Sequence, residues 1–182
     1  MLENFKQEFI TTKRLTTAYY RGGQEHSKKL LLIHGNMSSS VFFLPLLPEL
    51  SKSFDTLIPD LRCFGHSDSL PIDATRGFQD WTDDLKELLD ALGWETCTIL
   101  GWSLGGGIAM EFAIHHSHRV EKLALLAPCP PYGFGGTMNE DGIPIQPLGL
   151  GSGAGAANKQ LLMAVSAQGK QVLSGLLHSF CF

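Results

Sequence analysis

Residues 97–107 read CTILGWSLGGG, and this stretch decides which fold we expect. The short apolar run at 97–100 is typical of a buried strand, and residues 104–115 have the composition of a helix. Between them stands Ser103, flanked by glycines. A strand, a sharp turn and a helix in this order hold a serine in a strained backbone with its hydroxyl exposed. The stretch therefore predicts that Ser103 is a nucleophile, and the less favoured interpretation is an ordinary serine in an exposed turn.

The strand and helix around Ser103 belong to a longer alternation of the two element types. Further strands are expected at residues 14–20, 30–33, 54–59 and 123–127, and further helices at 42–50 and 78–92. The first of these strands is expected to be antiparallel, and Pro45 makes the start of the helix at 42–50 uncertain. Alternation of this kind predicts an α/β fold with a mostly parallel sheet, helices on both faces and functional loops at the carboxyl ends of the strands.

The character of the sequence changes after Pro128. Glycine and proline dominate residues 130–136 and 149–155, and only residues 158–177 regain a helical pattern. We therefore expect residues 1–128 to form the N-terminal part of the core. Residues 129–182 are expected to be the beginning of a cap or lid followed by a truncated tail.

A serine nucleophile needs backbone N–H groups that stabilise the oxyanion formed during acyl transfer. In folds with this turn, one donor is the residue after the nucleophile and the other lies in the loop after an earlier strand. These are Leu104 and Asn36, with Met37 as the next candidate for the second. His34 ends the strand expected at residues 30–33. A histidine in such a position is more often a structural residue than a base, and we interpret His34 in this way.

Three motifs follow one another in a fixed order: LIHGN at 32–36, DLRCFGHSD at 60–68 and GWSLGG at 101–106. Together they resemble the α/β-hydrolase fold superfamily over residues 30–128, with Cys63 where glycine is usual. His66 is expected at the surface. The resemblance implies a serine hydrolase that uses no cofactor. Residues 128–137 are similar to the cap entry of intracellular polyhydroxyalkanoate depolymerase-like esterases, which implies an ester of hydroxyacid type bound under a lid.

The rest of a catalytic triad is not identifiable. The fold places an Asp or Glu and then a His after the serine, each on a loop behind a later strand. Asp141 and His178 have the right order, but no strand precedes either, so we reject both. The sheet is expected to be incomplete at its C-terminal end, with apolar surface left exposed.

Two functions remain open. The first is a serine hydrolase acting on carboxylic esters through an acyl-Ser103 intermediate, with a small-molecule ester or acyl compound as its substrate. The alternative is a catalytically inactive, truncated fragment of such an enzyme, acting at most as a binding module. The oligomeric state is left open by the sequence.

Charge and composition exclude several other classes. A net charge of −4 with scattered basic residues argues against nucleic-acid binding. The polar N-terminus lacks the apolar core of a secretion signal, so a cytoplasmic protein is expected, and no apolar run reaches the roughly 18 residues of a membrane span.

The cysteines and histidines of the sequence also have plain structural interpretations. The four cysteines are widely spaced and are expected to be buried or half-buried free thiols, with no catalytic role for Cys129. His115, His116 and His118 meet the negative end of a helix dipole, so no metal site is expected there.

Overall fold

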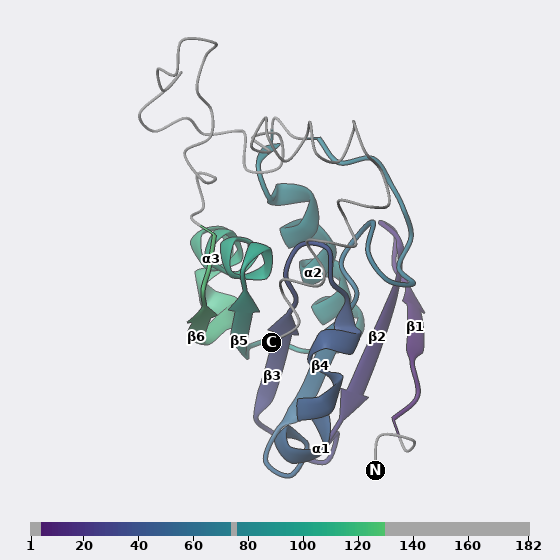
Figure 1. Ribbon diagram of the computed structural model, residues 1–182. Helices are drawn as coiled ribbons and strands as arrows, with labels where there is room; N and C mark the ends of the chain where they lie inside the picture. Colours follow the sequence, from purple (N-terminus) through teal and green to yellow (C-terminus); the bar gives the residue numbers. More distant parts are fainter. Residues whose placement is uncertain (1–4, 74–75, 130–182) are drawn as a thin grey trace.

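A computed structural model describes residues 5–73 and 76–129 of the chain (Figure 1). It contains one sheet of six strands in the order β1-β2-β4-β3-β5-β6. The strands are β1 (Glu8–Thr11), β2 (Thr16–Gly22), β3 (Lys29–Ile33), β4 (Asp55–Pro59), β5 (Cys97–Trp102) and β6 (Val120–Leu126). The α-helices are α1 (Leu47–Leu50), α2 (Gln79–Ala91) and α3 (Leu104–His115).

The sheet is mixed but mostly parallel. β1 pairs with β2 and β2 with β4 in antiparallel fashion, whereas β3 is parallel to both β4 and β5, and β5 is parallel to β6. Leu31 at the centre of β3 is paired with Leu57 on one side and with Ile99 on the other. The carboxyl ends of the four parallel strands therefore meet at one edge of the sheet, which is where the sequence places the functional loops.

Apolar side chains cover both faces of the sheet. Because successive residues of a strand point to opposite faces, Leu31 and Ile33 pack against the residues of α2 and α3, while Leu30 and Leu32 pack against Leu47 of α1 and its neighbours. Figure 1 shows α2 and α3 behind the sheet and α1 in front of it. The expected α/β-hydrolase fold, with helices on both faces of a mostly parallel sheet, is confirmed.

Two local expectations differ from the structure. Strand β1 was not expected, because Glu8–Thr11 is short and mostly exposed and so lacks a strong apolar alternation. The single helix expected at 42–50 is instead two 3₁₀ turns, Ser40–Phe42 and Leu44–Leu46, followed by the four-residue α1. Pro45 and Pro48 explain this difference, since each removes a backbone donor that a continuous helix would use.

Strand β6 forms one edge of the sheet and is largely exposed. The exposed fractions of Leu123, Leu125 and Leu126 are 38%, 41% and 51%. Apolar side chains are therefore exposed on this edge strand. The division expected after residue 128 stays a prediction, because residues 130–182 lie outside the described residues. Within residues 5–73 and 76–129, none of the helices has the length and apolar character needed to cross a membrane.

Candidate active site

Ser103 occupies a tight turn between β5 and α3. Its backbone has φ 54° and ψ −117°, a conformation that non-glycine residues rarely adopt. The N–H of Ser103 donates to the carbonyl of Leu126 at 3.0 Å, and its own carbonyl accepts from the N–H of Cys129 at 2.9 Å. Bonds to the end of β6 thus hold the turn in place, and the side chain of Ser103 is half-buried at the carboxyl edge of the sheet.

The loop after β3 lies directly against this turn. A Cβ atom placed on Gly35 would be 3.1 Å from the Cβ of Ser103 and 2.8 Å from the Trp102 ring. A Cβ placed on Gly105 would be 2.5 Å from the carbonyl oxygen of His34. Both approaches require glycine, so the sequence explains how the two segments come together.

Two unpaired backbone donors lie near Ser103. In the part of the chain that the structure describes, neither the N–H of Leu104 nor that of Asn36 donates to an acceptor. Leu104 is the first residue of α3, where orphan N–H groups and the positive end of the helix dipole are found. The N–H of Met37 instead donates to the side-chain oxygen of Asn36 at 3.0 Å. Asn36 is therefore better placed than Met37 to provide the second oxyanion donor.

His34 has the structural surroundings that its sequence position indicates. Its ring is buried, its Nε2 accepts the N–H of Leu61 at 3.0 Å, and its Nδ1 donates to the carbonyl of Gly35 at 2.8 Å. Burial lowers the pKa of His34 below its ordinary value. Both ring nitrogens are occupied, so His34 is not free to act as a base for Ser103.

The four parallel strands share one backbone feature. Each is followed by a non-glycine residue with positive φ, and these residues are Met37, Cys63, Ser103 and Ala127. The φ of 67° at Cys63 shows why glycine is common in the motif at that position. His66, in the same loop, is exposed, as expected.

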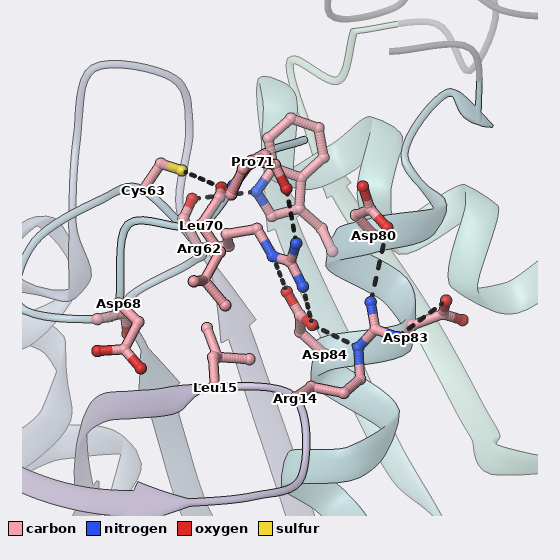
Figure 2. A network of polar contacts seen from close by, with 12 residues as sticks. Arg14, Leu15, Arg62, Cys63, Asp68, Leu70, Pro71, Asp80, Asp83 and Asp84 are labelled. Carbon is pink, nitrogen blue, oxygen red and sulfur yellow. Dashed lines mark hydrogen bonds and ion pairs between the residues drawn. The ribbon is translucent and has the colours of Figure 1, made fainter. Parts of the chain in front are cut away.

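A buried polar network fastens α2 to the loops beside it. The guanidinium of Arg62 donates two hydrogen bonds to Asp84, at 2.7 and 2.8 Å, and one to the carbonyl of Pro71 at 2.8 Å. Arg14 also donates to Asp84 at 2.7 Å (Figure 2). The pair with Asp84 raises the pKa of Arg62. Because neither Arg62 nor Asp84 reaches Ser103, the network is part of the scaffold. Sequence reasoning missed it, although the Asp-rich first turns of α2 were a signal.

The cysteines differ from one another in exposure. Cys97 and Cys129 are buried, and burial raises the pKa of Cys97 to about 12. Cys63 is exposed, which corrects the expectation that all of these thiols are at least half-buried. It lies in a turn at the surface, where its thiol donates to the carbonyl of Leu70 at 3.0 Å. Cys181 lies outside the described residues.

The histidines at the end of α3 are not gathered around a common point. His115 contacts Glu111 one helical turn earlier, with 3.1 Å between Nε2 and Oε1. Among residues 5–73 and 76–129, no group of three His, Cys, Asp or Glu side chains is arranged to hold a metal ion.

No triad partner for Ser103 is found in the described ranges. Asp141 and His178, which have the right order in the sequence, lie outside these ranges. The structure thus brings together Ser103, Leu104 and the loop of Asn36.

Comparisons with known proteins test the fold and the family of the chain. A family model described as the alpha/beta hydrolase fold matches residues 28–181. The 2-hydroxymuconate semialdehyde hydrolase of Pseudomonas sp. (strain CF600) is 38% identical over 100 residues, 53% of this chain and 35% of that protein. Carboxylesterase YbfK of Bacillus subtilis (strain 168) is 27% identical over 68% of this chain and 42% of its own length.

A solved structure shares the arrangement of the strands and helices. It is a serine hydrolase from the polyaromatic hydrocarbon-degrading bacterium Cycloclasticus zankles, which superposes with a TM-score of 0.65 and 28% identity. The match covers 71% of this chain and 46% of that one. The chain thus spans less than half the length of these three proteins.

Proposed function

Because the chain belongs to the α/β-hydrolase fold family, we propose that it acts as a serine hydrolase on carboxylic esters. The hydroxyl oxygen of Ser103 attacks the acyl carbonyl while a base takes its proton, and the N–H groups of Leu104 and Asn36 stabilise the oxyanion. Cleavage of the ester C–O bond then releases the alcohol with that proton and leaves the acyl group on Ser103, and water hydrolyses this acyl-serine ester to the carboxylic acid. The observation that carries this proposal is the strained backbone of Ser103, with φ 54° and ψ −117°. Strain of this kind costs free energy and is found where a function requires it.

The surroundings of Ser103 support an ester with an apolar acyl group. The ring of Trp102, the residue before Ser103, stacks on Phe42 with ring centroids 4.0 Å apart, and Phe42 is exposed by 48%. Apolar side chains with a few directed polar groups are typical of small-molecule sites. The finer assignment to esters of hydroxyacids stays a prediction.

The names of the relatives favour a hydrolase over an inactive fragment. Both curated relatives are named as hydrolytic enzymes, one of them a carboxylesterase. Ser103 needs a base that accepts its proton, and His34 cannot supply it because both of its ring nitrogens are engaged. The base must then come from outside residues 5–73 and 76–129.

A covalent probe tests the proposal directly. The full chain is treated with a fluorophosphonate, and the modified residue is located by mass spectrometry, with Ser103→Ala as the control. We expect a single adduct on Ser103 that is absent from the variant. Hydrolysis of p-nitrophenyl acetate, butyrate and octanoate then reports the acyl preference. A folded chain that neither reacts with the probe nor hydrolyses the esters would overturn the proposal.

A further inference from the structure

The loop between β3 and the first 3₁₀ turn is tied at both of its ends to the loop that follows β4. At its start, the ring of His34 accepts the N–H of Leu61 at 3.0 Å. At its end, the N–H of Ser40 donates to Oδ1 of Asp60 at 2.7 Å. Asn36 lies between these two ties and is exposed. The position of its N–H therefore depends on the ties rather than on packing around Asn36 itself.

The carboxylate of Asp60 is held in one position. Asp60 is buried, and its second oxygen, Oδ2, accepts the N–H of His66 at 2.8 Å and the side-chain amide of Gln7 at 3.1 Å. A Cβ atom placed on Gly65 would be 2.6 Å from Oδ1 of Asp60, so the turn closes directly over the carboxylate. One carboxylate thus joins the two loops by accepting N–H groups from both of them.

We propose that Asp60 is a positioning residue for the oxyanion hole. This inference rests on the function proposed above, since it assigns Asp60 to the same site. Asp60 does not touch the substrate. It fixes Ser40 and, with His34, holds the intervening loop against Ser103, so that the N–H of Asn36 stays aimed at the developing oxyanion. An error of about 1 Å in such a donor can cost about 100-fold in rate.

A matched pair of substitutions separates this role from general stability. Asp60→Asn keeps the shape of the side chain but replaces one acceptor oxygen by an amide donor, which cannot accept the N–H groups of both loops. Asp68→Asn makes the same change in the same loop. The Oδ2 of Asp68 accepts the N–H of Thr16 on β2 at 2.8 Å and has no contact with the loop of Asn36.

We expect Asp60→Asn to lower kcat for p-nitrophenyl esters by about 10- to 100-fold with little change in KM, because the donor acts mainly in the transition state. Asp68→Asn should keep kcat within about twofold of the unmodified chain. An equal fall in both variants, or an unchanged kcat in folded Asp60→Asn, would overturn the proposal.

Amide hydrogen exchange tests the tie without any need for activity. In the unmodified chain, the N–H of Ser40 should exchange slowly although it lies outside the sheet. Asp60→Asn should accelerate that exchange and shift the amide resonances of Asn36 and Met37, whereas Asp68→Asn should affect Thr16. If the unmodified chain hydrolyses no ester, the proposed function fails, and these resonances alone decide on the tie. A Ser40 amide that exchanges equally in all three proteins would refute it.

Discussion

Gly105 is the position where local helix propensity and tertiary packing make opposite predictions. It lies in the first turn of α3, and alanine in a helix is favoured over glycine by about 1 kcal/mol. A Cβ atom at this position, however, would be 2.5 Å from the carbonyl oxygen of His34 and would also collide with that of Ile33. Gly105→Ala therefore tests whether the contact between α3 and β3 is as close as described.

The expected loss follows from what has to move. A Cβ atom is essentially never found within 3.0 Å of a heavy atom outside its own residue and its chain neighbours, so α3 or the end of β3 must shift by at least half an ångström. The obstacle is backbone of a central strand, which cannot rotate away as a side chain can. Overpacking of this kind costs about 1–3 kcal/mol. After the gain of about 1 kcal/mol in helix propensity, we expect Gly105→Ala to lower the free energy of unfolding by about 0–2 kcal/mol.

Urea unfolding followed by tryptophan fluorescence measures this loss. The control is Gly107→Ala in the same helix, where a Cβ atom would meet the Sγ of Cys129 at 2.5 Å and the Phe78 ring at 2.8 Å. These neighbours are side chains, so we expect a smaller loss there. Because the shift reaches His34, Gly105→Ala should also slow fluorophosphonate labelling of Ser103. A Gly105→Ala chain that is more stable than the unmodified one would refute the described packing.

Three further predictions follow from buried groups. Burial lowers the pKa of His34 from 6.5, so the unfolded chain takes up a proton that the folded chain does not. The contribution of His34 to stability is complete above the unfolded-state pKa and is lost as the pH falls through the folded-state pKa. When the pH is lowered from about 8 to about 5, the urea concentration at the unfolding midpoint should therefore decrease, and it should decrease less in His34→Gln. Asp84→Ala leaves Arg62 buried without its partner and should lower the free energy of unfolding in urea by about 3–5 kcal/mol. Arg62→Met combined with Asp84→Leu should lower it less, and equal losses would argue against a buried pair. Burial raises the pKa of Cys97 to about 12, so its thiol should react with a thiol reagent only in denaturant, whereas exposed Cys63 should react in native buffer. Peptide mapping that finds both cysteines modified at the same rate in native buffer would contradict the burial of Cys97.

The elements around Ser103 were predictable because their signals are local. The apolar run that forms β5 and the small residues that open α3 determine the strand, the turn and the helix without help from distant segments. α2 is predictable for the same reason, since its apolar residues recur at helical spacing. β1 was missed because its place in the sheet depends on pairing with β2, which no pattern within Glu8–Thr11 reveals.

The site was only partly predictable. The motifs predict Ser103, Leu104 and Asn36 as site residues, and the structure brings the loop of Asn36 against the turn of Ser103. No sequence pattern indicates that the carboxylate of Asp60 accepts the N–H of Ser40, which lies twenty residues earlier in the chain. Such a hydrogen bond depends on how the two loops lie relative to each other, and neither the residue types nor their spacing predicts that arrangement.

The positive φ angles at Met37, Cys63, Ser103 and Ala127 define how this edge of the sheet tolerates mutation. Left-handed backbone costs a side chain about 1–2 kcal/mol, and glycine escapes most of that cost. In a deep mutational scan selected for abundance alone, glycine should be enriched at these positions and β-branched residues depleted. Selection for activity should reverse the preference at Ser103. The difference between the two scans would show where the chain keeps a strained residue for the sake of its side chain.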